Sequence, residues 1–173
     1  MSMPVYLRAL EQSDLERTHR WHNDPKLYGS LTQPFRFVST HAEATWLERR
    51  IAYSAEEVNL AICAVGTDEH VGNIYLRNID WVARTAGLHI FIGDGEMRSR
   101  GYGGAAIRLL CDYAFGTLNL RKIHLRVLSD NEAALKAYER AGFISEGVLR
   151  AHVFKDGAYR DLVMMALVSG GRA

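Results

Sequence analysis

The chain has 173 residues, 48% of them apolar and 24% charged, and its 21 basic and 20 acidic side chains give a formal net charge of +1. These values suit one globular domain, residues 1–173, and the balanced charge gives no electrostatic reason to expect nucleic acid or an anionic membrane as partner. Two cysteines are too few for a disulfide scaffold, and without a signal-peptide pattern or an apolar run of about 20 residues we expect a cytoplasmic location.

The first third of the chain predicts one strand followed by two helices. Residues 5–9 predict the strand. The sequences Ser13-Asp14-Leu15-Glu16 and Thr40-His41-Ala42-Glu43 each predict a helix start, because Ser or Thr followed by Glu three residues later can satisfy the first backbone N–H groups. We expect Asp24-Pro25 to end the first helix and a loop to follow it, and we expect the second helix to reach residue 51.

The middle of the chain predicts three strands, at residues 59–65, 71–79 and 87–92. Their short connections favour antiparallel pairing, since a parallel crossover needs a dozen residues or more. A helix follows, with apolar residues at helical spacing from about Ala106 to Tyr113.

The last third predicts a strand at residues 122–128, a helix at about 130–141 and two further strands at 143–154 and 159–168. Asp156-Gly157 between the last two is a strong hairpin signal. The fold class is therefore α/β, with a mixed, mostly antiparallel sheet of about six or seven strands flanked by about four helices and containing one parallel crossover.

An arginine- and glycine-rich segment, Arg98-Ser99-Arg100-Gly101-Tyr102-Gly103-Gly104, lies between the strand at 87–92 and the next helix. Glycines let the backbone turn tightly and approach a ligand, and the first N–H groups of a helix point outward unpaired. The helix dipole and the arginines add positive charge, so the segment predicts a site for a diphosphate. A solvated loop is the plain alternative.

A dinucleotide site is a second alternative for this loop, because Gly101, Gly103 and Ala106 match the pattern G-x-G-x-x-G/A. That pattern belongs in the first turn of a repeated parallel unit, whereas here an antiparallel meander precedes it. The predicted topology therefore disfavours a nicotinamide cofactor.

The helix at about 130–141 places Asn131, Ala134 and Tyr138 on one face, at positions i, i+3 and i+7. An amide, a small residue and a phenol together could hold a slender ligand. Alternatively, Asn131 caps the helix and Tyr138 packs with its hydroxyl at the surface.

Together these motifs resemble the GNAT superfamily of acetyl-CoA-dependent N-acetyltransferases. The resemblance rests on R-x-x-G-x-G before a helix, then N-x-x-A-x-x-x-Y-x-x-x-G-F about 30 residues later, and it covers residues 5–168. Leu7-Arg8-Ala9-Leu10 and Trp21-His22-Asn23-Asp24-Pro25 resemble the branch that holds ribosomal-protein-alanine and spermidine acetyltransferases, and some nucleotide-amino-sugar acetyltransferases are similar.

The resemblance implies the GNAT fold, with acetyl-CoA as co-substrate and no metal. It implies that the backbone of Ile90, Phe91 and Ile92 pairs with the pantetheine arm. It also implies that Asn131 hydrogen-bonds this arm, that Ala134 makes room for it, and that Tyr138 lies near the thioester sulfur. The pyrophosphate would be held by the loop residues Arg98, Ser99, Arg100, Gly101, Tyr102, Gly103 and Gly104.

Acetyl transfer to an amine needs a neutral amine and a proton for the leaving thiolate. Tyr138, with an ordinary pKa of about 10, is the expected general acid. Several family members have a glutamate where this chain has Gly87, so the base is open: His89, next on the same strand face, is a candidate because imidazole titrates near neutrality, and ordered water is the alternative.

The acceptor is expected between the first two helices, their joining loop and the final hairpin, with Tyr28, Phe35, Arg36 and Trp46 as binding residues. The expected function is acetylation of a primary amine of a small molecule, such as an amino sugar, a polyamine or an aminoglycoside-like compound. The loop's aromatic and cationic composition leans away from polyamines. Acetylation of a ribosomal-protein N-terminus and a non-catalytic acyl-CoA sensor are the alternatives, and a homodimer stays open.

Overall fold

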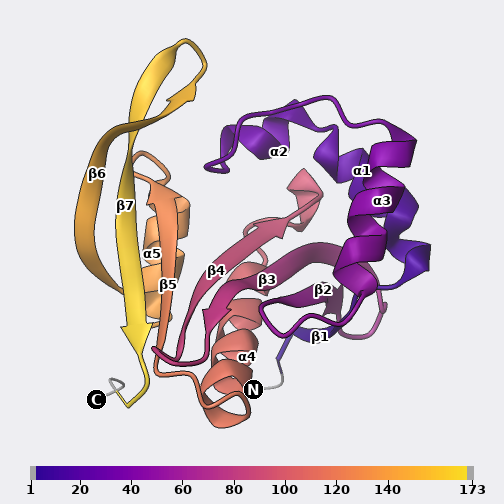
Figure 1. Cartoon of the computed structure of the whole chain (residues 1–173). Helices are drawn as coiled ribbons and strands as arrows, with labels where there is room; N and C mark the ends of the chain where they lie inside the picture. The colour runs from indigo at the N-terminus through magenta and orange to yellow at the C-terminus, as the bar shows by residue number, and fades with distance from the viewer. Residues whose placement is uncertain (1–2, 171–173) are drawn as a thin grey trace.

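The computed structural model describes residues 3–170, which form a seven-stranded sheet in the order β1-β2-β3-β4-β5-β7-β6 (Figure 1). Strands β4 and β5 are parallel and the other neighbouring pairs are antiparallel, which confirms the predicted mixed sheet with one parallel crossover. The strands are β1 (Val5–Ala9), β2 (Val58–Ala64), β3 (His70–Asp80), β4 (Thr85–Ile92), β5 (Lys122–Leu128), β6 (Ile144–Lys155) and β7 (Ala158–Val168).

The described residues form five α-helices and two short 3₁₀ turns. The helices are α1 (Leu15–His22), α2 (Pro25–Gly29), α3 (Thr40–Ile51), α4 (Tyr102–Gly116) and α5 (Glu132–Arg140), and the turns are η1 (Gln12–Asp14) and η2 (Gly95–Met97). Each of these helices is too short or too polar to cross a lipid bilayer.

Neither predicted capping box forms where it was expected, because an earlier residue is the N-cap in both places. At the first site, Glu11 and Asp14 form the capping box of η1, and the Glu11 N–H donates to Asp14 Oδ2 at 2.9 Å. Arg8 of β1 holds the Asp14 carboxylate in this position, donating to its two oxygens at 2.7 and 2.8 Å. At the second, Ser39 caps α3 in place of Thr40, and its hydroxyl accepts from the Ala42 N–H at 3.1 Å. A residue one or two positions earlier can therefore take over the cap when its backbone is extended.

The expected loop after Asp24-Pro25 begins instead with the short helix α2. Asp24 Oδ1 accepts a hydrogen bond from the Lys26 N–H at 2.9 Å, and Pro25 occupies the first helical turn, where its missing N–H costs nothing. The same dipeptide therefore separates α1 from α2 and starts α2. An Asp at the N-cap followed by a Pro in the first turn is a typical helix start.

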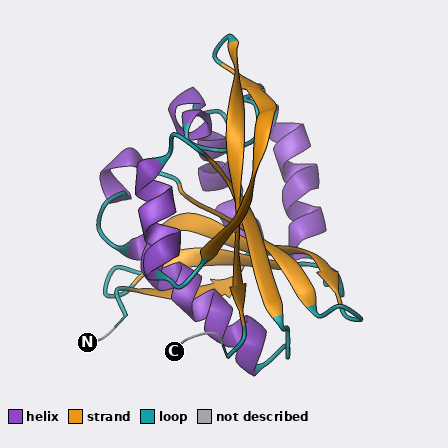
Figure 2. Ribbon diagram, turned by 90° about the vertical axis from the view of Figure 1, so that its left-hand side faces the viewer, coloured by secondary structure: helices purple, strands orange, loops and turns teal. Residues whose placement is uncertain are grey.

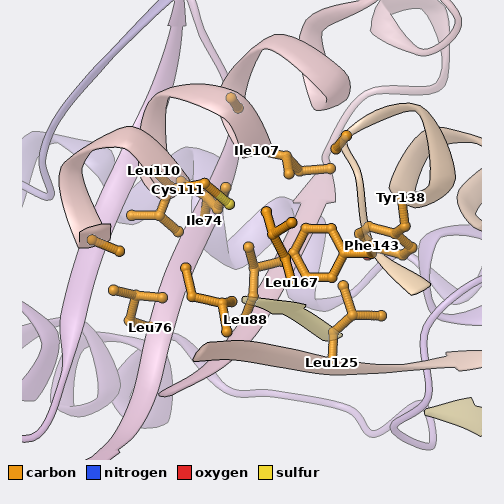
Figure 3. Packing of buried hydrophobic residues seen from close by; sticks show 14 of the residues in the cluster. Ile74, Leu76, Leu88, Ile107, Leu110, Cys111, Leu125, Tyr138, Phe143 and Leu167 are labelled. Atoms are coloured by element: carbon orange, nitrogen blue, oxygen red, sulfur yellow. The ribbon is translucent and has the colours of Figure 1, made fainter. Parts of the chain in front are cut away.

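The two faces of the sheet pack against different helices. On one face Ile74 of β3 and Leu88 of β4 lie in a cluster with Leu110 of α4 (Figure 3). On the other face Tyr75 lies in a smaller cluster with Leu47 of α3. Because successive side chains of a strand point to opposite faces, α4 and α3 cover opposite sides of the same central strands.

The C-terminal hairpin turns at Asp156 and Gly157, which both have positive φ angles, +50° and +79°, as the predicted two-residue turn requires. The hairpin projects beyond the rest of the sheet (Figure 2). At its turn end, the buried Lys155 ammonium donates to the carbonyl oxygens of Tyr28, Leu31 and Gln33 at 2.6, 2.8 and 3.0 Å, and so fixes the segment after α2 against the hairpin.

Candidate active site

The sheet opens between its two parallel strands. Only Thr85, Ala86 and Gly87 of β4 pair with β5, and within the described residues the β4 edge from 88 to 92 has no strand partner on that side. A cavity of about 1180 Å³, here called the central cavity, lies at this opening. An unpaired strand edge presents free N–H and C=O groups, so an extended ligand can pair with it as another strand would.

The start of α4 borders the central cavity and has the properties of an anion site. Gly101 is the N-cap residue, with a φ angle of +81° that favours glycine, and no side chain of the described residues caps the helix. The first N–H groups of α4 are thus available, and Gly103 and Gly104 line the cavity without side chains to cover them. This donor arrangement fits a diphosphate.

Two guanidinium groups flank this helix start. Arg98 donates to the carbonyl oxygens of Ile92 and Gly93 at 3.2 and 3.1 Å, so it closes the loop onto the end of β4 while lining the cavity. Arg108, one helical turn beyond Gly104, also lines the cavity. Sequence reasoning missed Arg108, although its i+4 spacing from Gly104 places it on the same helix face.

Helix α5 and its N-cap residue contribute the three predicted residues, Asn131, Ala134 and Tyr138, to the cavity lining. Asn131 caps α5, accepting from the Ala134 N–H at 3.1 Å, and donates to the Ser30 carbonyl oxygen at 3.1 Å. Tyr138 is 9% exposed and packs against Phe143, with ring centroids 5.8 Å apart (Figure 3). Burial raises the pKa of Tyr138 to about 12, so the phenol keeps its proton at neutral pH.

His89 lies on β4 on the face opposite α4, directly across from Tyr75 of β3. Its surroundings lower the pKa of His89, first through loss of hydration and then through the positive charges of Arg77, His124 and Arg126. The imidazole is therefore neutral at pH 7. A Cβ atom on Gly87 would lie 3.4 Å from the His124 ring and 3.9 Å from His89 Nε2, so these two histidines occupy the space beside the glycine.

The structure brings most of the predicted site residues to the central cavity. Arg100, Phe35 and Arg36 are not among the described residues that line it: Arg100 donates to the Glu96 carbonyl oxygen, and the Phe35 ring packs on Tyr28. The predicted residues that do line the cavity are Tyr28, Trp46, His89, Ile90, Phe91, Ile92, Arg98, Ser99, Gly101, Tyr102, Gly103, Gly104, Asn131, Ala134 and Tyr138.

Several lining residues were missed because they come from elements far apart in the sequence. Arg50 of α3, Tyr75 and Arg77 of β3, and Arg126 of β5 all line the central cavity. Strand alternation could have placed Arg77 beside Gly87 and Tyr75 beside His89 once β3 and β4 were paired, but the register had to be known first.

A mixed sheet that opens between two parallel strands, with an uncapped glycine-rich helix start beside the opening, defines the class of this protein as an acetyltransferase. Residues 5–144 match the family described as the acetyltransferase (GNAT) domain. The chain belongs to this family, as its motifs predicted.

Two relatives and one solved structure show how the family varies. A spermidine N(1)-acetyltransferase of Vibrio cholerae is 30% identical, with 97% of this chain and 95% of that protein covered. The Vibrio cholerae spermidine N-acetyltransferase in complex with CoA and spermine has a TM-score of 0.90 at 27% identity, covering 98% of both chains. An L-amino acid N-acetyltransferase of Escherichia coli K12 is 27% identical, with 95% of this chain and 98% of that protein covered.

Proposed function

We propose that this protein transfers the acetyl group of acetyl-CoA to a primary amine of a small molecule. The observation that supports the proposal best is the meeting of three features at one cavity: an uncapped helix start flanked by Arg98 and Arg108, an unpaired strand edge at 88–92, and the phenol of Tyr138. The crystal structure of the Vibrio cholerae relative contains bound CoA. A diphosphate bound at the start of α4 and a pantetheine arm along β4 would bring the thioester close to the Tyr138 phenol and to the free edge of β4.

In the reaction, the amine nitrogen forms a bond to the thioester carbonyl carbon and the carbon–sulfur bond breaks. The amine loses a proton and the thiolate gains one, so the products are an amide and the CoA thiol. Tyr138 supplies the proton to the departing sulfur. A thiol with a pKa of about 8.5 is a stronger acid than the phenol, so the phenol donates its proton only as the carbon–sulfur bond breaks. The phenolate then regains a proton from solvent, and the base that accepted the amine proton releases it to solvent.

The free edge of β4 supplies the second contribution. A backbone N–H near Phe91 or Ile92 can donate to the oxyanion that forms on the carbonyl oxygen, and a preorganised donor of this kind stabilises the transition state more than the ground state. The base that accepts the amine proton is His89, whose neutral imidazole suits this role, or a chain of ordered water leading from it.

The Tyr138→Phe variant tests the assignment of the general acid. We expect kcat to fall about 100- to 10,000-fold while the KM for acetyl-CoA changes little, because the ring still packs on Phe143 and only the proton donor is lost. Release of the CoA thiol measures the rate across a panel of amines. The matched control is Tyr53→Phe, at a tyrosine that is 95% exposed. An unchanged kcat in Tyr138→Phe would remove this role.

The alternatives give different results in the same assay. Tight binding of acetyl-CoA without thiol release on any amine would identify a non-catalytic sensor. Release only with peptides that begin like ribosomal proteins would identify an N-terminal acetyltransferase. The relatives do not decide between acceptors, since one is named for spermidine and another for L-amino acids.

A further inference from the structure

The walls of the central cavity differ from those expected for a polycation. Seven arginine and lysine side chains line the cavity, and among the described residues no aspartate or glutamate does. Four of the seven, in the glycine loop, α4 and α5, lie where the phosphates of the proposed co-substrate would bind. The other three, Arg50, Arg77 and Arg126, need another explanation, and they are called here the cationic cluster.

The cationic cluster lies on the side of the sheet that faces away from α4. In β3, Ile74 and Leu76 pack toward α4, so Arg77 shares the opposite face with Tyr75. In β5, the buried Leu125 and Val127 flank Arg126 and place it on that same face. Because α4 holds the predicted phosphate site on one side, the cluster lies on the side left for the acceptor.

The negative charges near the cluster are already paired with cations. Glu57 accepts from Arg77 at 2.5 Å and also from Arg50, so one carboxylate balances two guanidinium groups. Glu43 accepts from His22 at 2.7 Å, and Glu146 accepts from Lys122 at 2.6 Å. Arg126 forms no ion pair with any residue in the range 3–170. The acceptor side therefore keeps a positive excess.

Two buried polar groups, one within the cluster and one next to it, also lack hydrogen-bond partners among the described residues. Within the described chain, neither Arg50 Nε nor the Tyr75 hydroxyl has a hydrogen-bond partner, and both residues line the cavity. Tyr75 is 5% exposed, and the Arg77 guanidinium lies 4.4 Å from the centre of its ring. A buried donor without a partner is costly, which favours a ligand that accepts hydrogen bonds at this point.

We propose that the acceptor amine also carries an anionic group, a carboxylate or a phosphate, that binds to Arg50, Arg77 and Arg126 with the Tyr75 hydroxyl. This inference rests on the proposed function. A guanidinium group binds carboxylate and phosphate oxygens in pairs, whereas a polyamine would meet like charges and find no carboxylate on the cavity wall.

The test compares amines that differ only in the anionic group. α-Amino acids are paired with their carboxamides, phosphorylated amines such as phosphoethanolamine and glucosamine 6-phosphate with their unphosphorylated counterparts, and spermidine represents the polycations. We expect kcat/KM to be about 10- to 100-fold higher for the anionic member of at least one pair, and the two pair types distinguish carboxylate from phosphate. Equal rates within every pair, or a preference for spermidine, would overturn the inference while leaving the acetyltransferase activity intact.

Three variants locate the effect. Arg126→Gln should remove the preference for the anionic member, whereas Arg49→Gln, which removes the same charge from an exposed position of α3, should keep it. Tyr75→Phe should raise the acceptor KM without lowering the melting temperature, because the hydroxyl has no partner within the described chain. A lower melting temperature with an unchanged acceptor KM would show a structural role instead.

If no amine is turned over, the proposed function fails and binding decides the inference separately. Calorimetry on the protein saturated with CoA should then detect the carboxylate- or phosphate-bearing amines and not their neutral counterparts, and Arg126→Gln should abolish that heat. Equal heats for both members of each pair would overturn the inference.

Discussion

At the scale of single residues, the site depends on side chains whose charge state is set by burial. Tyr138 and His89 both line the central cavity, and loss of hydration changes the pKa of both. It raises the pKa of the phenol and lowers that of the imidazole, so both groups are neutral at pH 7. These are the forms that the proposed roles of Tyr138 as acid and His89 as base require.

His89→Gln tests the base through the pH dependence of kcat/KM. Protonation of His89 would abolish its role, so the wild type should lose activity as the pH falls through a value below about 6.5, the ordinary histidine pKa. In His89→Gln we expect a lower rate and no such acid limb, while His41→Gln, at an exposed position of α3, should behave as the wild type. An unmoved profile in His89→Gln would assign the base to water.

Gly93 shows how close packing holds the end of β4. A Cβ atom here would lie 2.0 Å from the ring of the buried Trp21, whose N–H donates to Asp94 at 3.2 Å. Gly93→Ala should therefore lower the free energy of unfolding by about 1–3 kcal/mol, measured by urea denaturation. Gly95→Ala, where the Cβ would meet nothing within 4 Å, is the matched control. Equal stability of the two variants would contradict the packing argument.

At the scale of elements, the strands were the most predictable part of the fold. Residues 5–9 and 122–128 form strands with the predicted bounds, because apolar alternation and turn residues mark both ends locally. The helix starts were less predictable, since adjacent residues such as Ser39 and Thr40 can both cap a helix and only the backbone path selects one.

The segment after α2 depends on contacts that the sequence does not show. Lys155 follows Tyr28 by more than 120 residues, yet its ammonium donates to the carbonyl oxygens of Tyr28 at the end of α2 and of Leu31 and Gln33 after it. Lys155→Met removes all three bonds while keeping an unbranched side chain that is one atom shorter. We expect a KM for the acceptor that is about 10-fold higher, because Tyr28, Leu31 and Gln33 line the cavity, with an unchanged KM for acetyl-CoA.

The control for this prediction is Lys26→Met, at an exposed lysine of α2. Steady-state kinetics with each substrate varied in turn would separate the two KM values. Equal acceptor KM values for wild type and Lys155→Met would show that the lysine holds the hairpin without shaping the site.

At the scale of the whole molecule, the proposed function depends on one irregularity of the sheet, the opening between β4 and β5. Strands β4 and β5 pair at Gly87 and not beyond, and the central cavity occupies the opening. Most residues expected to bind the cofactor could be predicted to lie together, because their motifs are contiguous, in the glycine loop and in α5. The cationic cluster proposed for the acceptor could not be predicted, because Arg50, Arg77 and Arg126 come from three elements that meet only in the folded protein.

A crystal structure of the protein with CoA would test the central claim most directly. We predict the diphosphate on the backbone N–H groups of Tyr102, Gly103 and Gly104, the pantetheine arm along the β4 edge at 90–92, and the sulfur within hydrogen-bond reach of the Tyr138 hydroxyl. A sulfur atom far from this hydroxyl, or a CoA molecule bound outside the opening between β4 and β5, would contradict the account.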